Sequence, residues 1–308
     1  MTFLYKSDPV RGAEWARHFA QKVPDLPFDI WPDFGNPLEV RYLAAWQPPP
    51  AIATTFPNLE ILFCTGAGID HIDLSTVPAS VSVVRMIEPG IADGMIEYVT
   101  LSVLALHRDW FEYGRQQQQG LWAPLRVQPA ASRRIGVLGL GVLGKAVIDR
   151  LHRIGFACAA WSRSPHRLDG IDCYAGSDEL SAFLARTDIL ICLLPLTDAT
   201  RGILDRKAFD TLPVGASIIN VGRGGHVVQQ DLLNALDAGR ISNAILDVAD
   251  PEPLPPDHLF WRHPRVVLTP HIASETQPET AVDAVLANIR RHRNGEPLMG
   301  LIDRGRGY

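Results

Sequence analysis

The sequence predicts an α/β protein in which helices cover both faces of parallel sheets. Short, almost continuously apolar runs alternate with helical patterns, which is typical of buried parallel strands. A glycine-rich turn joins one such run to the helix that follows it. The chain has 308 residues, of which 46% are hydrophobic and 20% charged. This composition fits one or two globular domains and excludes a disordered or low-complexity protein.

Charge and cysteine content narrow the class of protein. Lys and Arg number 29 against 34 Asp and Glu, and no basic run occurs, so we expect neither a nucleic-acid nor a membrane partner. No stretch of 18 consecutive apolar residues is present, and Met1–Lys6 resembles a strand rather than a secretory signal. The cysteines Cys64, Cys158, Cys173 and Cys192 are far apart, which predicts reduced thiols in a cytoplasmic protein.

The first hundred residues alternate short strands with short helices. A helical pattern without proline then runs from about Met95 to Phe111, and the polar, Gln-rich stretch Tyr113–Ser132 is interpreted as an arm or connection. The expected strands, each bounded by Pro, Gly, Asn or Asp, are Phe3–Tyr5, Val40–Ala45, Leu59–Cys64 and Val81–Val84.

The segment from Arg134 to His271 has the clearest alternation, and the tail Glu275–Gly295 is again helical. The expected strands are Ile135–Leu138, Cys158–Trp161, Ile189–Leu193, Ser217–Val221, Ala244–Val248 and Val266–Leu268. The expected helices between them are Lys145–Ile154, Leu180–Ala185, Arg206–Asp210 and Gln230–Ala238.

A GxGxxG motif follows the expected strand Ile135–Leu138. Gly139 permits the tight turn, Gly141 lets a pyrophosphate approach the backbone, and Gly144 lets helix and strand pack closely. With Val142 and Leu143 these residues open a helix, whose free N–H groups attract phosphates. An isolated motif would also fit an ordinary glycine-rich turn, or a methyltransferase or flavin loop. The surrounding strands favour a dinucleotide site.

The residues after the expected strand Cys158–Trp161 favour NADP over NAD as the cofactor. An NAD site usually has an acid here to bind the ribose hydroxyls, but no acid follows Trp161 until Asp169. Arg163, flanked by Ser162 and Ser164, can instead bind a 2′-phosphate. The alternative is that Arg163 is simply a solvated loop residue.

Three later strands end in candidate catalytic residues. Arg223 stands among glycines and suits a carboxylate or a polarised carbonyl. Glu252 lies in a proline-stiffened loop, and His271 follows the last strand. A histidine beside a carboxylate can act as a general acid, because the carboxylate favours the imidazolium. A metal site made of His271, Glu252 and Asp247 is an alternative, against which the nearby arginine argues.

Six ordered motifs cover almost the whole chain: Cys64–Asp73, Gly139–Gly144, Leu193–Thr197, Asn220–Gly224, Leu246–Pro255 and Thr269–Ala273. Together with the ending Ile302–Tyr308, they resemble the D-isomer-specific 2-hydroxyacid dehydrogenase family, and most of all its bacterial glyoxylate/hydroxypyruvate reductase branch.

The resemblance implies two Rossmann-like domains with parallel sheets around a cleft. Residues 1–96, completed by 272–308, would form a flavodoxin-like substrate domain, and residues 97–271 the NAD(P)-binding domain. A homodimer through the Met95–Ser132 region is also expected, since cyclic dimers are the commonest oligomers.

The resemblance also assigns residue roles. His271 would be the general acid/base, Glu252 would set its protonation, and Arg223 would bind the substrate carboxylate and keto group. Asp247 would contact the nicotinamide carboxamide. Further cofactor contacts would come from Leu194, Pro195, Val221 and Gly222.

In the first domain, the resemblance implies that the backbone N–H groups of Ala67 and Gly68 bind the substrate carboxylate. His71 would be structural. Trp46 and Trp122 could line the substrate pocket or could simply pack in the core.

The implied function is NADPH-preferring reduction of small 2-keto acids such as glyoxylate and hydroxypyruvate, with NADH as a possible second cofactor and no metal. Ala249 stands where relatives often have Phe, which would loosen one wall of the cleft. The alternatives are another dehydrogenase of the family, acting on lactate, glycerate or a bulkier acid, and a nucleotide-sensing regulatory protein on the same fold.

Overall fold

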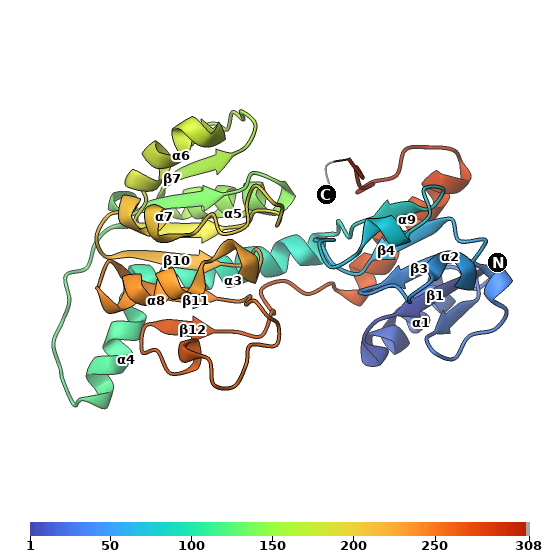
Figure 1. Cartoon of the computed structure of the whole chain (residues 1–308), viewed down its shortest axis with the longest axis horizontal. Coiled ribbons are helices and arrows are strands. Elements are labelled where there is room, and N and C mark those ends of the chain that lie inside the picture. The colour runs from blue at the N-terminus through green and yellow to red at the C-terminus, as the bar shows by residue number, and fades with distance from the viewer. Residues whose placement is uncertain (306–308) are drawn as a thin grey trace. The chain divides into compact units, whose positions relative to one another are not determined.

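The computed structural model describes residues 1–305, which form two compact units (Figure 1). The first comprises Met1–Ile91 and the segment from Glu275 onward, and the second comprises Ala92–Ser274. The sequence placed these boundaries after residues 96 and 271. The first boundary falls inside helix α3 (Pro89–His107), so no break in the helical pattern marks it. The last three residues of the predicted family ending, 306–308, lie outside the described residues.

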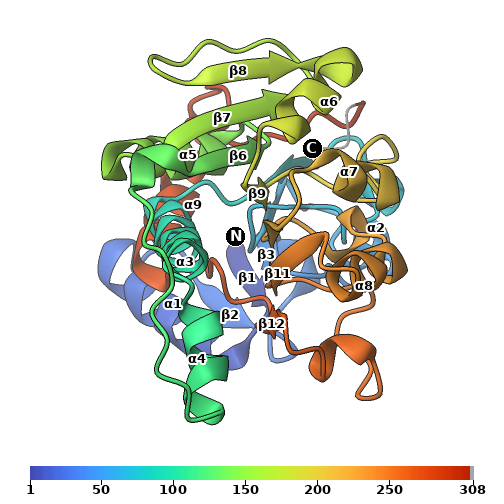
Figure 2. The same ribbon diagram turned by 90° about the vertical axis from the view of Figure 1, so that its left-hand side faces the viewer.

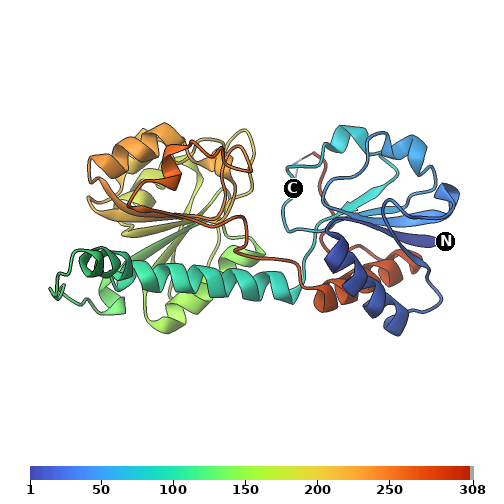
Figure 3. The ribbon, with the colours of Figure 1, turned by 90° about the horizontal axis from the view of Figure 1, so that it is seen from below.

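The first unit contains a five-stranded sheet in the order β2-β1-β3-β4-β5, with parallel pairing throughout. Helices α1 (Pro9–Lys22) and α9 (Pro278–Arg293) lie side by side on one face of this sheet (Figure 3). The strands are β1 (Thr2–Lys6), β2 (Phe28–Ile30), β3 (Val40–Ala45), β4 (Ile61–Cys64) and β5 (Ser82–Val84), with the short helix α2 (Ile52–Thr55) after β3.

The second unit contains a seven-stranded parallel sheet in the order β12-β11-β10-β9-β6-β7-β8. Its strands are β6 (Arg134–Leu138), β7 (Ala157–Ser162), β8 (Asp172–Ala175), β9 (Ile189–Cys192), β10 (Ala216–Asn220), β11 (Ile241–Leu246) and β12 (Val266–Leu268). Its helices after α3 are α4 (Trp110–Gln118), α5 (Val142–Ile154), α6 (Gly176–Ala185), α7 (Arg206–Thr211) and α8 (Gln229–Asp237).

Both faces of this larger sheet are covered (Figure 2). Helices α3 and α5 pack on one face, where Val99 and Val147 join a buried cluster with strand residues such as Val137. Helices α6, α7 and α8 cover the other face, where Phe183 and Phe209 pack in a second cluster. Side chains at successive strand positions therefore enter opposite cores, as expected of a strand buried on both faces.

The α/β fold class with parallel sheets is confirmed, and every predicted strand is present within three residues of its expected bounds. Strands β2 and β8 were not predicted from the sequence. Each is the outermost strand of its sheet, and neither contains a fully buried residue. An edge strand of this kind lacks the apolar run that identifies a central strand.

The helix predicted over Met95–Phe111 is wrong in its extent. Helix α3 begins earlier and ends at His107, and α4 starts at Trp110 after Asp109, whose φ is +54°. The first part of the predicted arm, Tyr113–Ser132, is therefore helical. Within residues 1–305, α3 is the one helix whose length and composition would allow it to cross a membrane. Its residues Met95, Val99, Val103 and Leu106 pack in the core of the second unit.

Candidate active site

The predicted catalytic residues follow three neighbouring strands of the larger sheet. Arg223 follows β10, Glu252 follows β11 and His271 follows β12. Because these strands are parallel and adjacent, their carboxyl ends meet at one edge of the sheet, where ligands bind in open α/β folds.

His271 and Glu252 form a direct pair, with 2.8 Å between His271 Nδ1 and Glu252 Oε2. Each member of the pair is also held by backbone. The Ala249 N–H donates to Glu252 Oε1 over 2.9 Å, and the His271 N–H donates to the Asp247 carbonyl over 2.8 Å. His271 has a φ of +57°, an uncommon conformation for a residue with a side chain. The turn therefore aims the ring at Glu252 at some cost in backbone energy.

The charges around Glu252 favour its ionised form. Burial alone would raise the pKa of this carboxyl group. The hydrogen bonds from His271 and the Ala249 N–H, with the positive charges of His271 and Arg223, outweigh burial and hold the pKa below its usual value. Glu252 is therefore a carboxylate at neutral pH, as a partner for an imidazolium must be.

Gly224 brings the Arg223 loop into contact with the Glu252 loop. A Cβ at Gly224 would lie 1.9 Å from the Ala249 carbonyl carbon, so only glycine fits between the two backbones. The Arg223 backbone is held on both sides, because Asn220 Nδ2 donates to its carbonyl over 2.9 Å and its N–H donates to His226 Nδ1 over 3.0 Å.

Asp247 holds the His271 turn. It is 2% exposed, and its two oxygens accept hydrogen bonds from Thr269 Oγ1 and from the N–H groups of Ile272 and Ala273, over 2.7–2.9 Å. Burial raises its pKa, while these bonds and the charge of His271 act in the opposite direction. The sequence predicted a contact between Asp247 and the nicotinamide. In this structure its side chain binds three groups of the same chain.

The glycine-rich loop fits a dinucleotide. A Cβ at Gly139 would lie 2.7 Å from the Leu193 carbonyl oxygen, and a Cβ at Gly144 would lie 1.9 Å from the Gly139 carbonyl oxygen. A Cβ built on Gly141 would have no atom within 4 Å, and no side chain caps the start of α5 at Val142. The first and third glycines are thus required by packing, and the second leaves the open approach that a pyrophosphate needs.

The predicted phosphate-binding residues lie at the end of β7, with Ser162 as its last residue and Arg163 and Ser164 directly after it. Arg163 and Ser164 are exposed. Ser162 is buried, and its hydroxyl donates to the Ser164 carbonyl over 2.7 Å, so in this structure it shapes the turn instead of offering its proton to a ligand.

The other expected cofactor contacts are also near strand ends. Leu194 and Val221 are buried after β9 and β10. The Pro195 carbonyl accepts a hydrogen bond from Thr200 Oγ1 over 2.6 Å, and the Gly222 N–H donates to Asn220 Oδ1 over 3.2 Å.

In the first unit, the loop that is predicted to bind the substrate carboxylate follows β4. In residues 1–305 no hydrogen bond occupies the N–H groups of Ala67 and Gly68. The Trp46 and His71 rings stack with centroids 3.7 Å apart, and a Cβ at Gly66 would lie 2.8 Å from the Trp46 ring. His71 thus supports Trp46 beside the loop.

Trp122, also considered for the substrate pocket, is 99% exposed, so its predicted packing role is wrong. This residue belongs to the arm after α4, not to a core.

Two polar residues of the site region were missed by the sequence analysis. His226 is fully buried, and Tyr98 on α3 lies 2.5 Å, oxygen to oxygen, from Thr269 Oγ1. Neither belongs to a sequence pattern that indicates a site, because Tyr98 lies within a helical pattern and His226 follows two glycines. Only the position of the Asn220–Gly224 motif just before His226 could have suggested it.

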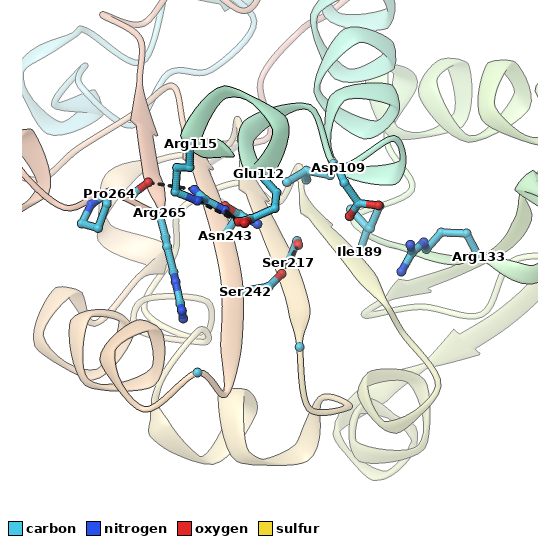
Figure 4. A pocket seen from close by; sticks show the side chains of 13 residues that line it. Asp109, Glu112, Arg115, Arg133, Ile189, Ser217, Ser242, Asn243, Pro264 and Arg265 are labelled. Carbon is cyan, nitrogen blue, oxygen red and sulfur yellow. Dashed lines mark hydrogen bonds and ion pairs between the residues drawn. The ribbon is translucent and has the colours of Figure 1, made fainter. Parts of the chain in front are cut away.

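A polar cavity of about 580 Å³ lies in the second unit at the amino ends of β9, β10 and β11 (Figure 4). Arg115, Arg133, Ser217 and Ser242 line it, and none of the predicted site residues does. Within the described chain no three His, Cys, Asp or Glu side chains are placed to hold a metal ion.

Comparisons with known proteins identify the family of this chain. Residues 100–273 match the model of the D-isomer specific 2-hydroxyacid dehydrogenase NAD-binding domain. The chain belongs to this family. It is 42% identical, over the full length of both chains, to a glyoxylate/hydroxypyruvate reductase A of Yersinia enterocolitica.

Solved structures of the family superpose on the whole chain. A dehydrogenase from Xanthobacter autotrophicus, in complex with NADPH and MES, has a TM-score of 0.95 at 38% identity, covering 100% of this chain and 99% of that one. An NADPH-dependent glyoxylate/hydroxypyruvate reductase from Sinorhizobium meliloti, bound to NADP and sulfate, has a TM-score of 0.92 at 32% identity with the same coverage.

Proposed function

We propose that this protein is an NADPH-preferring reductase of small 2-keto acids, with glyoxylate and hydroxypyruvate as its substrates. The observation that carries the proposal is the His271–Glu252 pair, held against the Arg223 loop by Gly224. The names of the full-length relatives point to the same reaction. Leu194, Pro195, Val221 and Gly222 would contact the cofactor beside the glycine-rich loop.

The chain's own residues would bind the substrate and deliver the proton. When bound, the reduced nicotinamide supplies the hydride. His271 has its Nδ1 engaged with Glu252, so Nε2 is the atom that would protonate the substrate oxygen. Arg223 would bind the carboxylate and polarise the keto group. The N–H groups of Ala67 and Gly68 would provide further donors. Because reduction consumes a proton, lower pH favours it.

Arg163 would select NADPH by binding the 2′-phosphate. The decisive assay follows loss of reduced-nicotinamide absorbance, with NADPH and NADH each tested against glyoxylate, hydroxypyruvate and pyruvate. Rapid NADPH oxidation with the first two acids is expected. Tight NADPH binding without any turnover would refute the proposal and favour a sensing role. Activity confined to pyruvate, which is reduced to lactate, would favour another member of the family.

Two variants separate the roles of the residues. His271→Ala should lose most turnover and keep its NADPH affinity; full activity would contradict the acid/base role. Arg163→Ala should weaken NADPH binding by at least tenfold, because it removes a charge-assisted contact, and leave NADH binding unchanged. An equal loss for both cofactors would contradict 2′-phosphate recognition.

We also propose that the protein acts as a homodimer in the cytoplasm. Large apolar side chains are exposed on α3, on α4 and on the arm, among them Leu101, Trp110 and Trp122, at 68%, 70% and 99%. A second copy would cover such a patch. The four cysteines are all free thiols, which suits a reducing compartment. Light scattering of the wild type and Trp122→Ser tests the dimer: a wild-type monomer would contradict it.

A further inference from the structure

A histidine that the proposed mechanism does not use lies between two loops of the second unit. His226 is 0% exposed and ends the short 3₁₀ turn Gly224–His226. Its Nδ1 accepts the hydrogen bond from the Arg223 N–H over 3.0 Å. Its Nε2 lies 3.3 Å from the Pro195 carbonyl oxygen. One ring therefore joins the loop that carries Arg223 to the loop after β9.

These two partners define the state of the ring. A backbone N–H can only donate, so Nδ1 carries no proton. A carbonyl can only accept, so Nε2 carries the proton. The imidazole is therefore neutral, and each of its nitrogens serves a different loop. Gly222 makes room for it, because a Cβ there would lie 3.0 Å from the ring.

We propose that His226 is a positioning residue that couples the substrate-binding loop at Arg223 to the cofactor-binding loop at Pro195. This inference rests on the proposed function, which assigns those two loops. Both ring nitrogens of His226 meet backbone groups. With Asn220 on the Arg223 carbonyl, it fixes both polar groups of the peptide backbone from which the guanidinium extends. Removing the Nδ1 link leaves the Arg223 N–H without this acceptor, and removing the Nε2 link leaves the Pro195 carbonyl held by Thr200 Oγ1 without the ring. Either change loosens one of the two loops.

Two substitutions separate the links. In His226→Asn, the side-chain oxygen can replace Nδ1 as acceptor for Arg223, but the side chain is too short to reach Pro195. In His226→Gln, the side-chain amide can replace the Nε2–H donor, but the acceptor for Arg223 is lost. His107→Asn is the matched control, because His107 is also a buried histidine of the second unit and lies on α3, away from the predicted site residues in the sheet edge loops.

Calorimetric titration then measures NADPH binding to each variant, and oxalate binding to its NADPH complex. Oxalate stands in for the keto acid and needs no turnover. One lost hydrogen bond corresponds to about a fivefold change in affinity. We expect His226→Asn to weaken NADPH about fivefold and spare oxalate, and His226→Gln to do the reverse. Equal losses in both variants, or changes no larger than in His107→Asn, would overturn the coupling.

A spectroscopic measurement on the wild type does not depend on how well the variants fold. In a long-range ¹H–¹⁵N spectrum, the ring signals of His226 are those that disappear in His226→Gln. In the wild type they should show a neutral ring with its proton on Nε2. A proton on Nδ1 would overturn the assignment. A wild type that binds NADPH and oxalate but reduces no keto acid refutes the proposed function and leaves this test intact, whereas one that binds neither refutes both.

Discussion

Replacing Gly224 by alanine tests whether contact between two loops holds the catalytic pair in place. The new Cβ would lie 1.9 Å and 2.0 Å from the carbonyl carbon and oxygen of Ala249. Cβ contacts under 3.0 Å are essentially never seen, so the loops must separate by about 1.1 Å. The Ala249 N–H holds Glu252, so Glu252 moves with that loop relative to Arg223.

A misplacement of about 1 Å can cost about 100-fold in rate. We therefore expect kcat of Gly224→Ala with NADPH and glyoxylate to fall about 100-fold. The next residue provides the control. A Cβ at Gly225 would meet only the flexible ends of Arg201 and Leu196 at 3.0–3.3 Å, so Gly225→Ala should stay close to wild type.

NADPH affinity and the melting temperature show whether each variant folds. A folded Gly224→Ala protein with kcat within twofold of wild type would refute the reasoning. An equal loss of kcat in both variants would also refute it, because the added methyl group meets backbone at Gly224 and only flexible side chains at Gly225.

Three further outcomes are expected. Because the folded-state pKa of Glu252 is lowered, ionisation of this carboxyl group contributes stability that is complete above about pH 4.5 and fades as pH falls through that lowered pKa. The melting-temperature gap between wild type and Glu252→Gln should therefore shrink in acid, and a widening gap would contradict this. Three cysteines are buried and Cys173 is partly exposed, so a thiol reagent should label one thiol quickly in the native protein and four after denaturation. Tyr98→Phe loses the hydrogen bond to Thr269 and should lower kcat about fivefold with unchanged NADPH affinity; unchanged kcat would show that the bond does not support the site.

The central strands and the glycine-rich loop could be predicted from sequence because their signals are local. A strand buried on both faces needs an unbroken apolar run, and β10 and β11 both have one. Helices α3 and α4 were merged because the residue between them, Asp109, takes a positive φ without being glycine. Its conformation is set by how the two helices pack, which a one-dimensional pattern does not contain.

The site shows the same division. Arg223, Glu252 and His271 each follow a recognisable strand, and parallel pairing brings them to one edge. The roles of Asp247 and His226 depend on partners more than twenty residues away in sequence, in the turns that each of them holds. Such long-range hydrogen bonds leave no local signature, because a buried polar residue among apolar neighbours resembles core.

The division of the first unit between the two ends of the chain has a consequence for biosynthesis. Helix α9 packs beside α1, and the Ile302 N–H pairs with the Val83 carbonyl of β5. A ribosome must therefore synthesise all of Ala92–Ser274 before the first unit can be completed. At about 5–20 residues per second, its amino-terminal half waits roughly 10–40 s with exposed strands. During that interval a chaperone that shields β5 would benefit this unit, while the second unit can already fold.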